Sequence, residues 1–396
     1  MILKYLILLE PIFRGSRLQI LFYTLNSLKN MYDEIYIITR KDYFTDHFKE
    51  FSARTEAKYT VVAIESLDLK NAWLKKLTIK EMKAVFKTLR DLINKLRMQD
   101  NAKIDVIFMA LDDYFLPFVM LHEFFLLRKK GIRYFGIRYR ILYTGTNTLE
   151  KIKQFTVITL LKYLIARKFK ILVFDERVRE LPACVKKGFY ILPDPWEGPY
   201  SGNLRASARK RYNIGDDKFV ISLIGRQNKR KGFSFILLHL EDILQINRNI
   251  VVFISGKIEN QIEENTLRNI VGKYPERIIY IDRFLSEDEI AYSFAVADVI
   301  LLPYSKEFGF SSGVLVRACA TGVPVITTSH GLIGYRVKTN NIGLTFDYGN
   351  FNSLRSCLET IMKEKSIYEL LKMGCKKFAE NNTVKVFGNV LSRVME

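Results

Sequence analysis

The stretch from Val299 to Thr328, which reads VILLPYSKEFGFSSGVLVRACATGVPVITT, is the part of the chain that decides the fold class. Its first four residues form an apolar run of strand type that a proline ends. A polar, Gly-rich loop follows, and from Ser312 the spacing is helical up to Gly322, which predicts the end of the helix. A second buried strand begins at the next residue. Strand, loop, helix and strand in this order predict a βαβ unit of a parallel sheet.

The loop in this unit, residues 305–313, opens onto the N-terminus of the predicted helix. Unpaired backbone N–H groups and the helix dipole favour an anion such as phosphate at such a place. Many doubly wound proteins have loops of this kind that hold no ligand. The loop alone therefore leaves phosphate binding and a plain turn as alternatives.

A wider pattern surrounds the loop, with P-Y-x-x-E before it and A-x-A-x-G-V-P-V-I after it. This pattern resembles the donor site of the family-4 retaining glycosyltransferases, the glycosyl transferases group 1. The resemblance implies an α/β protein of the GT-B fold, in which two Rossmann-like doubly wound domains face a cleft. It implies no metal and no cofactor, because the donor substrate is a nucleoside diphosphate sugar.

The family signature E-x(7)-E is altered in this chain. In the family its first Glu contacts the donor sugar and its second contacts the ribose. Glu307 is the candidate for the first, and Arg317 stands where the second belongs. Because Arg317 cannot accept hydrogen bonds from ribose hydroxyls, either the ribose is held otherwise, or the donor is unusual, or activity is lost. The residues that still offer hydroxyls and amides to a diphosphate are Ser311, Ser312, Gly313, Val314 and Leu315.

A second signature, GRQNKRKG over 225–232, follows a predicted strand and begins a helix. It resembles the family's G-R-x(4)-K-G. A nucleotide-sugar donor leaves as a diphosphate, so negative charge grows in the transition state, and fixed cations stabilise it. We therefore assign this role to Arg226 and Lys231, with Gly225 in the turn. A solvated basic turn is the alternative.

The loop DRFLS at 282–286 is the candidate segment for binding the nucleotide base, and its pattern matches the family strongly. There the loop before the helix cap holds the base, and the resemblance carries this role to Arg283, Phe284 and Leu285. Ser286 is a natural N-cap, since Glu289 follows three residues later as in a capping box.

Two candidates lie in the first half of the chain. Gly15 follows the first predicted strand, where family members carry a Gly-rich loop that faces the cleft. Asp112 and Asp113 follow a later predicted strand, and as adjacent carboxylates they either face solvent and cap a helix or position an acceptor hydroxyl.

The length of 396 residues predicts two domains, and the scattered Cys and His residues indicate no zinc site and fit a reducing cytoplasm. The expected boundaries are 1–195 for an acceptor-side domain, 196–380 for a donor-nucleotide domain, and 381–396 for a tail that packs back on the first domain in some members of this fold. Strands are expected at 3–9, 34–39, 59–64, 104–110, 132–137, 171–174, 189–192, 219–224, 250–255, 278–281, 299–302, 323–327 and 344–346. Helices are expected at 18–30, 73–97, 117–130, 151–168, 176–187, 233–245, 262–273, 287–297, 312–321, 353–364, 367–380 and 384–394.

The charge balance points to an anionic partner. The net charge is +20, and residues 1–200 hold 35 Lys and Arg against 22 Asp and Glu. Lys70–Arg97 reads as a basic amphipathic helix, which is either a core-facing helix with a solvated face or a membrane-surface element. No apolar run is long enough to span a membrane. Nucleic acid is not expected as a partner, because no RNA or DNA motif is present.

The sequence therefore predicts a glycosyltransferase of hexosyltransferase type. It would move a sugar from a nucleoside diphosphate sugar to a hydroxyl of a glycan or lipid-linked acceptor, with retention, in cell-surface polysaccharide or glycolipid synthesis. The alternative is a catalytically silent glycosyltransferase-like protein that binds a partner or an acidic membrane surface. The expected location is the cytoplasm, with a peripheral position on the inner face of the cell membrane as a further hypothesis.

Overall fold

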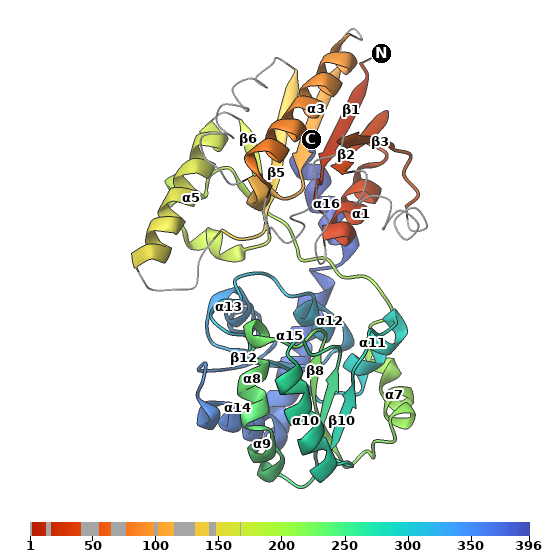
Figure 1. Cartoon of the computed structure of the whole chain (residues 1–396), viewed down its shortest axis with the longest axis vertical. Coiled ribbons are helices and arrows are strands. Elements are labelled where there is room, and N and C mark those ends of the chain that lie inside the picture. The colour runs from red at the N-terminus through yellow and green to blue at the C-terminus, as the bar shows by residue number, and fades with distance from the viewer. Residues whose placement is uncertain are drawn as a thin grey trace. The chain divides into compact units, whose positions relative to one another are not determined.

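A computed structural model of the protein describes residues 2–12, 17–40, 55–64, 77–98, 102–114, 131–141, 148–166 and 168–396. These residues form two compact units (Figure 1). The first unit holds the described residues up to Pro193 together with Lys385–Glu396, and the second holds Asp194–Val384. Each unit is built on one parallel sheet with helices around it, so the predicted α/β class with two doubly wound domains is confirmed.

The sheet of the first unit has seven parallel strands in the order β3-β2-β1-β4-β5-β6-β7. Its central strands are continuous apolar runs, as expected for strands that are covered on both faces. Every residue of β1 after Lys4, for example, is fully buried. The strands are β1 (Lys4–Leu9), β2 (Glu34–Arg40), β3 (Thr60–Ile64), β4 (Lys103–Phe108), β5 (Ile132–Arg138), β6 (Phe169–Val173) and β7 (Phe189–Ile191).

Helices cover both faces of this sheet. On one face Phe86 of α3 packs against Phe108, with ring centroids 5.9 Å apart. On the other face Phe174 stacks on Phe387 of the C-terminal helix α16, and Lys170 donates to the carbonyl of Val394 at 2.5 Å. The helices of this unit are α1 (Arg17–Leu28), α3 (Ile79–Arg97), α5 (Thr148–Ala166), α6 (Ala183–Lys186) and α16 (Val384–Met395), with 3-10 turns at Leu111–Tyr114 and Glu176–Glu180.

The second unit has a six-stranded parallel sheet in the order β10-β9-β8-β11-β12-β13. The quoted stretch provides β11, α12 and β12 of this unit, so the predicted βαβ unit is confirmed. The strands are β8 (Phe219–Ile224), β9 (Ile250–Ser255), β10 (Ile278–Ile281), β11 (Val299–Leu302), β12 (Val325–Thr328) and β13 (Gly343–Phe346). The helices are α7 (Arg205–Arg211), α8 (Phe233–Leu238), α9 (Leu240–Ile246), α10 (Gln261–Lys273), α11 (Glu287–Ala295), α12 (Gly313–Thr321), α13 (Gly331–Asn340), α14 (Phe351–Lys363) and α15 (Lys365–Glu380), with 3-10 turns at Gly202–Leu204 and Lys229–Lys231.

Two of the predicted helices were wrong in extent. In place of the helix expected over 176–187, the chain forms a 3-10 turn and then the short α6. Pro182 causes this break, because it has no backbone N–H and favours an extended conformation at the residue before it. That residue, Leu181, has a ψ of 150°. The helix expected over 233–245 breaks at His239 into α8 and α9. Two helices, α7 and α13, were not predicted, and α13 was missed because two glycines lower its helix propensity.

Some predictions fall outside the described residues. They are the glycine loop with Gly15, the helix expected over 117–130, and the part of the basic helix that precedes Leu77. The described part of that helix, α3, begins with a full capping box between Thr78 and Glu81.

A buried ion pair joins the start of the second unit to its interior. Arg336 of α13 is fully buried, and its guanidinium lies 2.9 Å from the carboxylate of Asp194. The backbone N–H of Asp194 donates to the side chain of Asn382 at 2.9 Å, and that of Trp196 donates to the Asn382 carbonyl at 3.0 Å. The segment that enters this unit is therefore fastened to the segment that leaves it.

We predict that Arg336→Ala lowers the free energy of unfolding by about 3–5 kcal/mol, because it leaves the Asp194 carboxylate buried without its partner. Urea unfolding measures this loss. The matched control is Arg355→Ala, since Arg355 is exposed and pairs with Glu359 at 3.0 Å, so its removal costs at most about 1 kcal/mol. Equal losses in both variants would contradict the assigned role of the buried pair.

Candidate active site

The candidate site lies at the carboxyl ends of the strands in the second unit. The loops that follow β10, β9, β8 and β11 are neighbours at this edge because their strands are neighbours in the sheet. The loop after β8 carries Arg226 and Lys231, and the loop after β11 carries Glu307. Two signatures that lie about eighty residues apart in the sequence thus come from adjacent positions in the sheet.

The loops after β8 and β11 contact each other directly. Gly232 has a φ of 74°, and a Cβ atom on it would lie 1.7 Å from the carbonyl oxygen of Pro303. Both the N–H and the hydroxyl of Ser305 donate to the carbonyl of Arg230, at 3.1 and 3.0 Å. The guanidinium of Arg230 lies 5.0 Å from the ring centroid of Phe308. These contacts join the two predicted clusters into one site.

Lys231 lies inside this contact. Its ammonium is 6.0 Å from the ring centroid of Tyr304 and 3.2 Å from where a Cβ on Gly225 would lie. Burial, and after it the nearby cations of Arg230 and Arg226, lower its pKa to about 8. An anion bound between these groups would raise the pKa of Lys231 again, because a nearby negative charge favours the ammonium form.

Arg226 is one of the exposed cations of the site. Its guanidinium pairs with Glu259 at 3.2 Å, in the loop after β9. The backbone of Gln227 holds the two loops together, since its N–H donates to the carbonyl of Lys257 and its carbonyl accepts from the N–H of Glu259. The sequence did not indicate Glu259, because its partner lies on another strand end and no local pattern links them.

The loop before α12 keeps the first turn of that helix open. The hydroxyl of Ser312, the N-cap residue, lies 3.0 Å from the hydroxyl of Tyr304 and does not cap the helix. Among the backbone bonds of the described residues, the N–H groups of Gly313 and Val314 have no carbonyl partner. The first turn therefore leaves backbone donors available, and anion binding at this loop stays a prediction.

The remaining predicted residues of this loop differ in exposure. Glu307 is exposed, and its N–H donates to the Ser305 hydroxyl at 3.3 Å. Ser311 is partly buried. Leu315 is fully buried in the core, so it offers only its backbone to a ligand.

Arg317 extends along α12 beside its first turn. One of its terminal nitrogens lies 4.0 Å from where a Cβ on Gly313 would be, and its guanidinium lies 5.4 Å from the ring centroid of Tyr200. The hydroxyl of Tyr200 donates to Glu287 at 3.1 Å. A positive group, and not a carboxylate, therefore stands at this position of the site.

The loop after β10 is held by its own helix cap. The predicted capping box between Ser286 and Glu289 is confirmed. Arg283 pairs with Glu289 at 2.6 Å, and this hydrogen bond lowers the pKa of the Glu289 carboxyl to about 2. Phe284 is 79% exposed, so its ring is accessible for stacking, while Leu285 is partly buried.

The acceptor-side candidates belong to the first unit. Both oxygens of Asp112 accept backbone N–H groups, from Tyr139 at 2.8 Å and Arg140 at 3.3 Å, and Arg138 lies 3.5 Å away. Asp112 thus braces the end of β5, and its role toward an acceptor stays a prediction. The side chain of Asp113 lies outside the described part of the structure.

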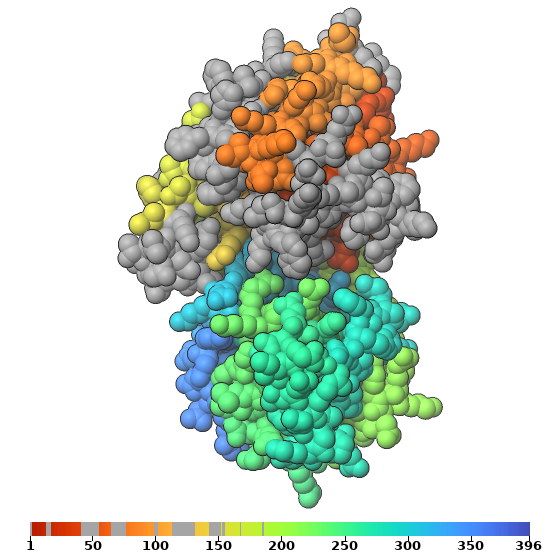
Figure 2. Space-filling model, in the orientation of Figure 1, coloured from red at the N-terminus to blue at the C-terminus, as the bar shows by residue number. Residues whose placement is uncertain are grey.

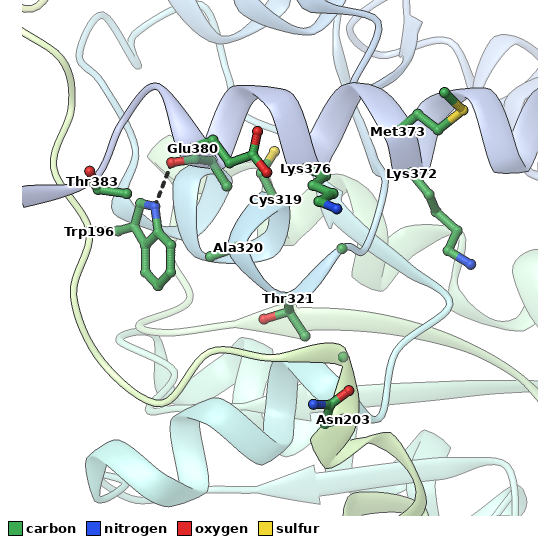
Figure 3. Close-up of a pocket in the computed structure, with 13 residues that line it drawn as sticks. Trp196, Asn203, Cys319, Ala320, Thr321, Lys372, Met373, Lys376, Glu380 and Thr383 are labelled. Carbon is green, nitrogen blue, oxygen red and sulfur yellow. Dashed lines mark hydrogen bonds between the residues drawn. The ribbon is translucent and has the colours of Figure 1, made fainter. Parts of the chain in front are cut away.

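A separate pocket lies at the other end of α12 (Figure 3). Its volume is about 560 Å³, and Trp196, Thr321, Met373 and Lys376 are among its lining residues. The indole N–H of Trp196 donates to the carbonyl of Ala379 at 2.9 Å. None of the predicted site residues lines this pocket.

The described residues hold no group of three or more His, Cys, Asp or Glu side chains that could bind a metal ion. No helix among them is long and apolar enough to cross a membrane.

Comparison with known proteins agrees with this geometry. Residues 205–381 match the family described as Glycosyl transferases group 1. The chain is 29% identical over 183 residues to the putative glycosyltransferase YtcC of Bacillus subtilis, covering 45% of this chain and 44% of that protein. It is 25% identical over 174 residues to the capsular polysaccharide biosynthesis glycosyltransferase CapM of Staphylococcus aureus, covering 43% and 44%. The chain thus spans about half the length of these curated relatives.

Solved structures resemble the whole chain. HepE of Anabaena in complex with UDP has a TM-score of 0.67 at 12% identity, covering 99% of both chains. Sucrose-phosphate synthase of Thermosynechococcus elongatus has a TM-score of 0.65 at 12% identity, covering 99% of this chain and 98% of that one. The fold is therefore that of the GT-B glycosyltransferases. Within this fold, residues 205–381 are the part of the chain that matches the glycosyl transferases group 1 family.

We predict that the affinity of the site for a nucleoside diphosphate falls as the pH rises from 7 to 9.5, because Lys231 loses its proton near its pKa of about 8. A bound diphosphate favours the ammonium, so binding takes up a proton, and affinity falls by at most about tenfold per pH unit. Titration calorimetry in two buffers measures this uptake. Lys231→Met should abolish the difference, whereas Lys229→Met, at an exposed neighbour, should keep it. The same pH dependence in all three proteins would contradict the assignment.

We also predict that Gly232→Ala destabilises the second unit by at least about 2 kcal/mol, because it adds a clash with the Pro303 carbonyl to a left-handed backbone. Gly322→Ala is the matched control, since its φ is 78° and nothing lies within 4 Å of the added Cβ. It should lose only about 1–2 kcal/mol. Chemical denaturation compares the two variants, and equal losses would mean that the contact between the loops contributes nothing.

Proposed function

We propose that this protein transfers a hexose-type sugar from a nucleoside diphosphate sugar to a hydroxyl of a glycan or lipid-linked acceptor, with retention of configuration. The observation that carries the proposal is the convergence of Arg226, Lys231 and the open first turn of α12 on one edge of the sheet. CapM, a relative in capsular polysaccharide biosynthesis, supports a role in cell-surface polysaccharide or glycolipid synthesis.

The proposed chemistry follows from the charge on the leaving group. Breaking the bond between sugar and diphosphate concentrates negative charge on the diphosphate, and groups that bind it more strongly as the charge grows accelerate the reaction. Lys231 provides a partly desolvated point charge. Arg226 provides a planar guanidinium that would exchange its ion pair with Glu259 for a bidentate contact with the phosphate. Glu307 would orient the donor sugar. These groups need no metal to neutralise the diphosphate.

The donor nucleotide is the first thing to test. HepE has been solved with UDP and with UDP-glucose, which makes a uridine donor the first choice. We expect UDP-sugars to raise the thermal unfolding temperature more than GDP- or ADP-sugars do. A ligand at 100 times its Kd stabilises the native state by about 2.7 kcal/mol, which a thermal-shift screen detects. No stabilisation by any common nucleotide sugar would contradict donor binding.

We predict that Arg226→Ala lowers kcat by about 10²–10³ with the donor that the screen identifies, because one stabilising group for the diphosphate is lost. Its stability should change by at most about 1 kcal/mol, since the pair with Glu259 is exposed. Arg248→Ala, at another exposed arginine of this unit, is the matched control and should turn over normally. If Arg226→Ala kept full turnover, the diphosphate role would be wrong.

A second candidate function is supported by Arg317. In the related family a glutamate at this position accepts hydrogen bonds from the ribose, and a guanidinium cannot do so. A catalytically silent homologue that binds a partner or an acidic membrane surface is therefore the alternative. Stabilisation by a nucleotide sugar together with turnover would exclude it. Neither stabilisation nor turnover with any nucleotide sugar, with Arg317→Glu restoring neither, would favour it.

A further inference from the structure

Helix α3 of the first unit presents an unusual row of cations to solvent. The exposed cations on it are Lys80, Lys83, Lys87, Lys95 and Arg97. Among the described residues, none of these five has an ion pair, although other cations of the chain do. Glu81 does not neutralise them, because it pairs with the buried Arg40 at 3.2 Å. Asp91 is the one other acid on the helix, so its outward face is strongly positive.

Two exposed helices of the second unit, α10 and α14, are built differently. On α10 Arg268 pairs with Glu264 at 2.7 Å, and on α14 Glu359 lies between Arg355 and Lys363 at 3.0 and 3.2 Å. Such pairs within a helix neutralise most of its surface charge. The contrast shows that the positive face of α3 is a local feature, and not only a consequence of the net charge of +20.

Exposed apolar side chains lie on another helix of the same unit. Helix α5 buries one face in the unit, yet on its outward side Ile152, Phe155 and Tyr163 are 55%, 74% and 37% exposed. Their spacing of three and eight residues places them on one side of the helix. The ends of α3 add Ile79 and Met98, which are 49% and 89% exposed. Lys168, just beyond the end of α5, is exposed as well.

Both helices cover the same face of the sheet. The connections from β3 to β4 and from β5 to β6 step in the same direction along the strand order, whereas the step from β1 to β2 goes the other way. Right-handed crossovers then place α3 and α5 on one face and α1 on the other. Figure 2 shows α3 in orange and α5 in yellow at the surface of this unit.

We propose that the outward faces of α3 and α5 form a docking surface for an anionic lipid bilayer. Each Lys or Arg held near acidic headgroups strengthens binding about fivefold, and exposed apolar side chains enter the boundary between headgroups and acyl chains. The combination fits a bilayer better than a nucleic acid, which has phosphates but no apolar layer for Ile152 and Phe155. The docking surface stands independently of the proposed transfer reaction, and it would bring a lipid-linked acceptor within reach.

The test uses the full-length protein and vesicles, with no donor or acceptor present. We expect it to sediment with vesicles of 30% phosphatidylglycerol in phosphatidylcholine, to release in high salt because ions screen the attraction, and not to bind pure phosphatidylcholine. Lys83→Glu/Lys87→Glu should weaken binding at least tenfold. Phe155→Ser should weaken vesicle binding about threefold or more. High salt should also release a larger fraction of this variant than of the unaltered protein.

Two matched controls keep the outcome specific. Lys338→Glu/Lys377→Glu changes the net charge equally at exposed lysines of the second unit, and Leu370→Ser removes an apolar side chain that is 63% exposed there. Both should bind as the unaltered protein does, and thermal melting confirms that every variant is folded.

Three results would overturn the proposal: no binding to anionic vesicles, equal weakening by the control lysine pair, or unchanged binding of Phe155→Ser. Binding of RNA that the α3 variant abolishes, with no vesicle binding, would assign the surface to a nucleic acid instead. A thermal-shift screen with nucleotide sugars distinguishes these failures from a failure of the proposed function, because the assigned cations Arg226 and Lys231 lie in the second unit and the docking surface lies in the first.

Discussion

The approach of Gly232 to the carbonyl of Pro303 is the constraint on which the site depends. No side chain fits between these two backbones, and the left-handed φ of Gly232 is one that other residues rarely adopt. The close contact lets the loop after β8 lie directly on the end of β11, where Ser305 bonds to Arg230. A wider spacing would separate Lys231 from Tyr304 and from the first turn of α12.

The electrostatics of this region are unfavourable without a ligand. Lys231 is partly desolvated and lies near two arginines, and both effects lower its pKa. Glu259 forms its ion pair with the exposed Arg226, and not with Lys231. Proteins retain such an arrangement where an anion relieves it, because like charges in a low-dielectric setting repel strongly. The charge repulsion around Lys231 and the proposed diphosphate site therefore arise from the same group of side chains.

Much of the fold was predictable from local patterns. Central parallel strands are continuous apolar runs, and proline and glycine mark their ends, so each described strand lies within two residues of its predicted range. The capping box at Ser286 was readable because it involves residues three apart. Breaks inside helices were harder, since His239 carries no sequence signal for a break, and α13 was hidden by its two glycines.

The sequence by itself determined the fold class, the two signatures and the positive charge of the first half, because each depends on residues close together in the chain. Tertiary structure alone decided which residues meet. The pairing of Arg226 with Glu259, the contact of Arg317 with Tyr200 and the bracing of β5 by Asp112 join residues from different strand ends. It also decided that the five exposed cations of α3 have no ion pair among the described residues, while Arg268 of α10 and Arg355 of α14 have one. Parallel strands bring their carboxyl ends to one edge regardless of their separation in sequence, and no local pattern records that arrangement.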